Sequence, residues 1–137
     1  LVGSEMCIRD RPKTILGIAG VDVGDKMIGE NFADVLHKAN PNRPNEVFAQ
    51  ISESRVGRAI RTADYAYSVY APGINGGAQP AADLYADDFF YDLKKDPYEL
   101  NNLVDDPAYT QVKQELRKKL LNWIRTAENA SPEIVDA

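Results

Sequence analysis

The chain is 137 residues long and carries 16 lysines and arginines against 21 aspartates and glutamates, a formal net charge of −5. Nucleic acid and anionic membranes would repel a protein of this sign, so neither is an expected partner. No apolar run approaches the roughly 20 residues that a membrane-spanning helix needs. With one histidine and one cysteine, the chain cannot form a tetrahedral Cys/His zinc site by itself.

The start of the chain differs from the rest. Residues 1–11 show neither helical nor strand periodicity, and they resemble an adapter-derived sequence, SEMCIRDR, found at the ends of assembled metagenomic sequences. We therefore expect an artefactual leader and leave it out of the fold prediction. Without it the chain has no cysteine, because Cys7 is the only one. Pro12 is then expected to lie inside a longer reading frame.

Two short helices are predicted before residue 45. Pro12 suits a first helical turn and Gly20 can adopt the left-handed conformation that closes a helix, so residues 12–19 are expected to be helical. This helix is expected to be the tail of a longer one. Apolar residues at helical spacing predict a second helix at 32–39, which ends at the Pro- and Asn-rich segment 40–44. That segment is the clearest internal boundary.

Strand-like sequence follows this boundary. Four runs have strand character: residues 47–52, 57–62, 65–71 and 84–93. In the third run Tyr65, Tyr67 and Val69 share a face, as in a half-buried strand. The connections between the first three runs are too short for parallel crossovers, so these strands are expected to be antiparallel.

The C-terminal part predicts a long amphipathic helix. Asp106 is a suitable N-cap, and Pro107 suits the first helical position. Apolar residues then recur every three or four positions from Tyr109 to Ala127. This stripe is expected to cover the aromatic face of the sheet, which gives an α+β fold with a helix on a small antiparallel sheet of about four strands. Residues 129–137 are expected to form a frayed tail.

No complete catalytic set is visible in the sequence. A nucleophile–histidine pair would need His37, which is better explained as a surface or interface residue of a short helix. The adjacent carboxylates Asp87 and Asp88 are better explained as solvated turn charges than as a metal or acid–base site.

The most polar group of residues lies between the first two predicted strands. Glu53, Ser54 and Arg55 form the turn, and Arg58 follows on the next strand. Such groups can bind an anionic or hydroxylated ligand through charge-assisted hydrogen bonds. A polar hairpin with cross-strand ion pairs explains the same residues without a ligand, and the residues alone favour this second interpretation.

Three segments of the chain follow one another in a distinctive order and at a distinctive spacing. They are Arg61-Thr-Ala-Asp-Tyr-Ala-Tyr67, the run FYDLKKDPYELNNL from Phe90 to Leu103, and Asp106-Pro107 before the closing helix. Together they resemble the C-terminal end of type I sulfatases, the formylglycine-dependent members of the alkaline-phosphatase-like superfamily. Ala66 stands where many members of that family have lysine.

The resemblance continues upstream and implies a domain organisation. The segments Pro12–Gly20 and Met27–Gly29 resemble a helix and loop that precede the C-terminal end of sulfatases, although Asn31 stands where serine is usual. Residues 12–44 are therefore expected to be the tail of a large α/β sulfatase domain, and residues 45–128 its C-terminal subdomain.

For the parent protein the resemblance implies hydrolysis of sulfuric esters with calcium and a formylglycine made from a C/S-x-P-x-R motif. Cys7–Arg11 lacks the proline, and Ala39–Arg43 has alanine in place of the nucleophile. This chain is therefore expected to lack nucleophile, metal site and cofactor. The implied partners are the missing N-terminal catalytic domain and, in the parent, a sulfated carbohydrate or aryl sulfate. The sequence predicts a soluble chain and does not specify its location, and the resemblance is compatible with a periplasmic or secreted parent.

In that setting Glu53, Ser54, Arg55 and Arg58 are candidates for the rim of the substrate cleft, with a purely structural role as the alternative. The expected function is that of a sulfatase C-terminal fragment that packs on the catalytic domain, borders the substrate cleft and is inactive alone. The alternative is a stand-alone carbohydrate- or protein-interaction module that uses the tyrosine-rich sheet.

Overall fold

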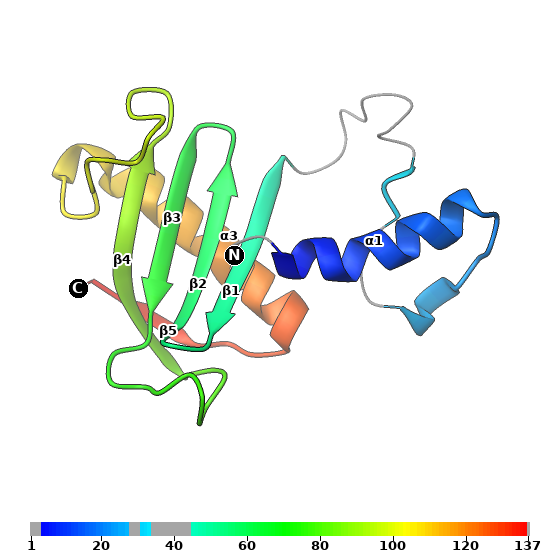
Figure 1. Ribbon diagram of the computed structural model, residues 1–137. Coiled ribbons are helices and arrows are strands. Elements are labelled where there is room, and N and C mark those ends of the chain that lie inside the picture. Colours follow the sequence, from blue (N-terminus) through cyan, green and yellow to red (C-terminus); the bar gives the residue numbers. More distant parts are fainter. Residues whose placement is uncertain (1–3, 28–30, 34–44, 137) are drawn as a thin grey trace. The chain divides into compact units, whose positions relative to one another are not determined.

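The computed structural model describes residues 4–27, 31–33 and 45–136 (Figure 1). The chain divides into two compact units, Leu1–Asn45 and Glu46–Ala137, and each is described by itself. Most of the helix predicted at 32–39 lies outside the described residues, and so does His37.

Unit 1 begins with helix α1, Ser4–Ile18, which continues through Pro12. Residues 12–18 are thus the end of a longer helix, as expected, although Pro12 lies inside the helix and not in its first turn. Residues 4–11 have fair helix propensity without an apolar stripe, so a periodicity criterion misses them. Gly20 has φ +76° and closes the helix, as predicted. A short 3-10 helix, η1, follows at Gly24–Lys26. That residues 1–11 are an artefactual leader stays a prediction.

Asn31 brings the chain back against α1. A Cβ added to Gly17 would lie 2.0 Å from the Asn31 side-chain nitrogen, so a larger residue there would displace the Asn31 side chain. The Asn31 side-chain oxygen accepts a hydrogen bond from the Ala33 amide at 2.9 Å, and the Phe32 amide donates to Thr14 Oγ1 at 3.1 Å.

Unit 2 is built on one five-stranded sheet. Its strands, in spatial order, are β1 Glu46–Ser52, β2 Val56–Thr62, β3 Tyr65–Tyr70, β4 Leu84–Asp92 and β5 Glu133–Val135. The first four are antiparallel neighbours, as predicted. β5 pairs parallel with β4, so the prediction of a frayed tail is wrong for residues 133–135. A three-residue strand has too little alternation to be recognised, and its partner lies some fifty positions upstream.

The crossover between β4 and β5 is the predicted C-terminal helix. It consists of the 3-10 helix η2, Pro107–Tyr109, and α3, Thr110–Glu128. Asp106 caps it as predicted, because its carboxylate accepts from the Ala108 amide at 2.9 Å. Figure 1 shows α3 crossing behind the sheet, which confirms the α+β class.

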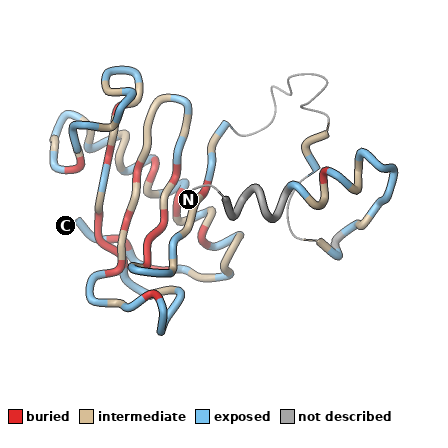
Figure 2. Tube along the Cα trace, viewed as in Figure 1, coloured by how far each residue is buried: buried red, intermediate tan, exposed pale blue. Residues whose placement is uncertain are grey.

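The core of unit 2 lies between α3 and one face of the sheet, where the buried segments of Figure 2 concentrate. Leu116, Leu120 and Ile124 are the buried residues of α3. Phe48 stacks on Trp123 with ring centroids 6.2 Å apart. The fully buried sheet residues are Val56, Ile60, Tyr67, Val69, Tyr85, Asp87 and Phe90. Alternation along the strands, together with a β-bulge in β4 between Asp87 and Phe89, places them all toward α3.

Candidate functional site

The predicted polar hairpin exists and lies at one end of the sheet. The last pair of the β1–β2 register is Ser52 with Val56, so Glu53, Ser54 and Arg55 form the turn. The Glu53 amide donates to the Arg55 carbonyl at 3.3 Å. Glu53 and Ser54 are exposed and Arg55 is half-buried. Three of the four predicted site residues are thus brought together on an accessible turn.

Arg55 is held in place without being covered. Its Nη2 lies 2.6 Å from Asp88 Oδ2, and its guanidinium carbon lies 4.8 Å from the centroid of the Tyr70 ring. Its side chain keeps 41% of its surface exposed. An ion pair and a cation–π contact therefore orient the guanidinium while leaving part of it free to meet a ligand.

Arg58 lies elsewhere, beneath the hairpin and on the α3 side of the sheet, with 2% of its surface exposed. Its Nε and Nη2 contact the two Glu128 carboxylate oxygens at 2.5 and 2.8 Å. Nη1 donates to the Gly57 carbonyl at 2.7 Å, and Nη2 to the Pro80 carbonyl at 3.0 Å. This bidentate pair ties the hairpin to the end of α3.

The loop between β3 and β4 supports the same turn. Ser52 Oγ donates to the Pro80 carbonyl at 2.7 Å. Gly76 packs on the turn so closely that a Cβ there would lie 2.6 Å from the Glu53 carbonyl oxygen. Because the obstructing atoms are backbone, no larger residue fits, and the loop and turn form one ordered end of the sheet.

Asp87 corrects the sequence prediction of a solvated turn charge, because it is 2% exposed and faces α3. Lys113 Nζ lies 2.7 Å from its Oδ2, Arg117 Nη2 donates to both of its oxygens at 2.9 Å, and the Tyr67 hydroxyl donates at 2.5 Å. Burial raises the pKa of Tyr67 far above its ordinary value, and the hydrogen bond to Asp87 adds to this. The sequence signal that could have indicated a buried partner for Asp87 is the pair of cations Lys113 and Arg117, which lie four residues apart beside the apolar stripe of α3.

The same cations hold the C-terminal tail. Arg117 Nη2 donates to Asp136 at 2.7 Å, and Lys113 Nζ lies 3.6 Å from that carboxylate. The hydrogen bond from Arg117 and its positive charge lower the pKa of Asp136. The Asp87 cluster is therefore an internal ion-pair network that joins β4, α3 and the segment after β5.

A metal site is not apparent in residues 4–27, 31–33 and 45–136, since no three His, Cys, Asp or Glu side chains there converge on one point. The most buried carboxylate, Asp87, has both oxygens occupied by Lys113, Arg117 and Tyr67. None of the described helices is long and apolar enough to cross a membrane.

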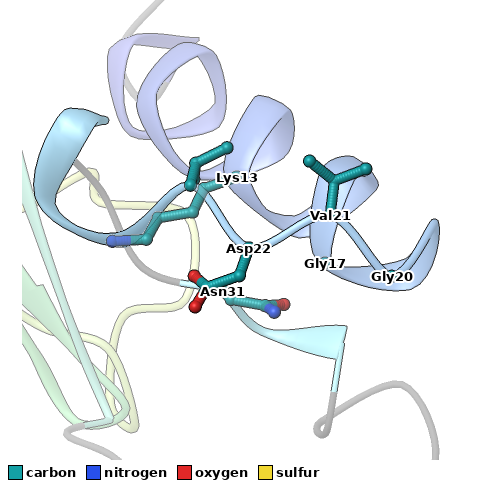
Figure 3. Close-up of a pocket in the computed structure, with 7 residues that line it drawn as sticks. Lys13, Gly17, Gly20, Val21, Asp22 and Asn31 are labelled. Carbon is teal, nitrogen blue, oxygen red and sulfur yellow. The ribbon is translucent and has the colours of Figure 1, made fainter.

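Unit 1 contains an open pocket of about 300 Å³ beside the end of α1 (Figure 3). Lys13, Asp22 and Asn31 contribute its polar side chains, and Lys13 Nζ also donates to the Met27 carbonyl at 3.4 Å. The remaining lining residues are Gly17, Gly20, Val21 and Val23. None of the site residues predicted from the sequence lines this pocket.

Comparison with known proteins decides the family. The family described as "N-sulphoglucosamine sulphohydrolase, C-terminal" matches residues 4–126. The chain belongs to this family. It is a sulfatase C-terminal domain, and the resemblance seen in the sequence is confirmed.

Individual relatives agree with this assignment. A Delta 4,5-hexuronate-2-O-sulfatase of Bacteroides thetaiotaomicron is 30% identical over 122 residues, which cover 85% of this chain and 23% of that protein. An ulvan-active sulfatase of Formosa agariphila is 25% identical over 114 residues, covering 78% and 20%. The solved structure of a 2-O GAG sulfatase aligns with a TM-score of 0.67 at 25% identity, covering 88% and 25%. The chain thus spans a fifth to a quarter of these sulfatases.

Proposed function

We propose that this domain is the C-terminal part of a carbohydrate sulfatase, packs on the N-terminal catalytic domain of the same protein and borders its substrate cleft. The family match over residues 4–126 carries the proposal. The names of the relatives, a hexuronate 2-O-sulfatase and an ulvan-active sulfatase, support a sulfated carbohydrate as the substrate class.

We also propose that the domain is inactive alone. The described residues do not fit a calcium site, because no carboxylate cluster converges among them and Asp87 is already satisfied by protein partners. Calcium and formylglycine therefore belong, in this proposal, to the catalytic domain, where they would supply the charge and the nucleophile for ester hydrolysis. The role left to this chain is to position substrate and to complete the fold.

The hairpin turn is the proposed contribution to the cleft rim. Arg55 is oriented by Asp88 and Tyr70 but remains partly exposed, so it can donate hydrogen bonds to a sulfate or carboxylate of the sugar chain. Glu53 and Ser54 beside it can bind sugar hydroxyls. Arg58 acts differently, as a positioning residue that supports the turn from below through Glu128.

The first experiment assays the 137-residue chain and the parent protein, obtained by extending the reading frame upstream of Pro12. Both are given calcium with an aryl sulfate or a 2-O-sulfated unsaturated uronate disaccharide. We expect turnover by the parent, whose added sequence should contain C/S-x-P-x-R, and none by the chain alone. Turnover by the chain alone, or none by the parent with any sulfated substrate, would contradict the proposal.

A second experiment separates the rim role from a structural one. In the parent, Arg55→Met should raise KM roughly tenfold with little change in kcat, because hydrogen bonds to an ionic group are lost. Lys118→Met, a cation-to-Met change on the exposed side of α3, is the matched control and should leave KM unchanged. An unchanged KM in Arg55→Met would show that the turn is structural only.

A further inference from the structure

The sheet has a second face, opposite α3, that no described element of unit 2 covers. It faces the viewer in Figure 1, where α3 lies behind the strands. Val47, Ile51 and Phe89 point to this side and are exposed, although all are large apolar residues. Phe89 and Tyr91 stack there with ring centroids 5.9 Å apart. Exposed large apolar side chains on an uncovered sheet face are typical of a protein–protein contact.

A loop after β4 adds two strongly exposed apolar side chains, Tyr98 at 82% and Leu100 at 78%. The loop is nonetheless tightly ordered, because Asp96 accepts from the Asn101 amide at 2.7 Å and Asn102 accepts from the Phe90 amide at 3.0 Å. Between the two apolar residues, Glu99 has φ 57°, a conformation that L-residues other than Gly, Asn and Asp seldom adopt. The protein thus holds a strained loop rigid while presenting Tyr98 and Leu100 outward.

The loop and the open face belong to one surface. Glu99 forms an ion pair with Arg61. Arg61 is the cross-strand neighbour of Val47 and shares its face of the sheet. The pair therefore joins the rim of the loop to the apolar face.

Charges around this surface are compensated within the domain. Arg61 pairs with Glu99, Arg55 with Asp88, and Lys94 with Asp64. A partner that covered the face would therefore bury few unpaired charges. An apolar centre with neutralised charges is characteristic of permanent interfaces rather than transient ones.

We propose that the open face and the loop residues Tyr98 and Leu100 form the docking surface for the catalytic domain of the parent sulfatase. This inference rests on the proposed function and specifies which surface makes the contact. The occupant follows from the comparisons, since more than seven-tenths of each matched sulfatase lies outside the region that this chain covers. A permanent, apolar partner is what the rest of the same protein supplies.

The experiment compares thermal unfolding of the 137-residue chain and of the parent, each with Leu100→Asp or Val47→Asp. In the chain both changes should shift Tm by less than roughly 2 °C, because both side chains are exposed. In the parent both should lower Tm by roughly 5 °C or more, since a carboxylate would be buried without a partner. Gln114→Asp, on the exposed side of α3, is the control and should leave both proteins unchanged.

Several outcomes would overturn the proposal. One is an equally small shift in chain and parent. Another is a dimer of the chain that Leu100→Asp dissociates while the parent is unaffected, because the face would then join two copies. A third is a reading frame that ends close to Pro12, which would leave no catalytic domain to dock.

The sulfatase assay keeps the two proposals distinguishable. A parent that both substitutions destabilise but that hydrolyses no sulfate ester would support the docking surface and contradict the proposed function. An active parent that tolerates both substitutions would support the proposed function and contradict the docking surface.

Discussion

The two faces of the sheet use similar side chains in opposite ways. Toward α3, aromatic residues such as Tyr67 and Phe90 are buried, and the charged residues Arg58 and Asp87 are buried with them in paired form. On the opposite face Phe89 and Tyr91 stack on each other, and the ion pairs lie only at the rim.

The two faces therefore have different roles: one determines the stability of the domain, and the other is available for binding. The face toward α3 holds the helix, the hairpin and the C-terminal tail together through desolvated contacts, so changes there should unfold the domain. The opposite face contributes little to the folded chain itself and is available to a partner. Four predictions test this division, in order of decreasing expected effect.

The largest effect is expected from Asp87→Asn. It leaves Lys113 and Arg117 without their buried counter-charge, which should reduce the free energy of unfolding by about 3–5 kcal/mol. Urea denaturation followed by circular dichroism measures it. Asp88→Asn, which removes the partner of the more exposed Arg55, is the control and should cost less than about 1 kcal/mol. Equal losses in the two variants would refute the division.

A pair of leucines tests the apolar contacts directly. Leu120→Ala, in the α3 core, should lower the free energy of unfolding by about 3 kcal/mol, because the side chain is fully buried and leaves a cavity. Leu100→Ala on the loop should change it by less than about 0.5 kcal/mol. A large loss in Leu100→Ala within the 137-residue chain would mean that the loop is already packed there.

The two arginines of the hairpin provide a third comparison. Arg58→Met should cost about 2 kcal/mol, because Glu128 and the Pro80 carbonyl lose a buried donor. Arg55→Met should cost less than about 1 kcal/mol in the same thermal or urea unfolding measurement. The reverse order would assign the structural role to Arg55.

The smallest effect concerns Glu46, at the edge of the face toward α3. Burial raises the pKa of Glu46, but hydrogen bonds from Lys119 and Trp123 outweigh this and hold the pKa below its ordinary value. A carboxylate with a lowered folded-state pKa stabilises the protein above its unfolded-state pKa and loses that contribution as the pH falls. Glu46→Gln should therefore cost about 1 kcal/mol at pH 7, and this cost should shrink as the pH falls through the lowered pKa of the folded state. If the free energy of unfolding of Glu46→Gln differs from that of the unsubstituted protein by the same amount at every pH, this explanation is contradicted.

Much of the fold was predictable because it depends on local spacing. Strand-like runs identified β1 to β4 to within about a residue of their observed bounds, and Asp106-Pro107 identified the start of the C-terminal helix. β5 was missed because a parallel strand of three residues depends on a partner distant in sequence. The N-terminal part of α1 was missed because propensity without an apolar stripe gives no periodic signal.

The candidate site was predictable only in part. Glu53, Ser54 and Arg55 are adjacent in sequence, so a turn necessarily brings them together. The ion-pair partners of the two arginines are distant in sequence. Asp88 lies 33 positions from Arg55, and Glu128 lies 70 positions from Arg58. No local sequence pattern indicates contacts between residues so far apart in the chain.

The sequence by itself determined the family, the four antiparallel strands and the amphipathic helix, because motif spacing and side-chain alternation are properties of the chain. Only the tertiary structure decided which charges are buried and which are free. Burial depends on what lies opposite each side chain, and at Arg58 and Asp87 that is set by how α3 crosses the sheet. The same crossing leaves the other face open, and from that face the docking surface is inferred.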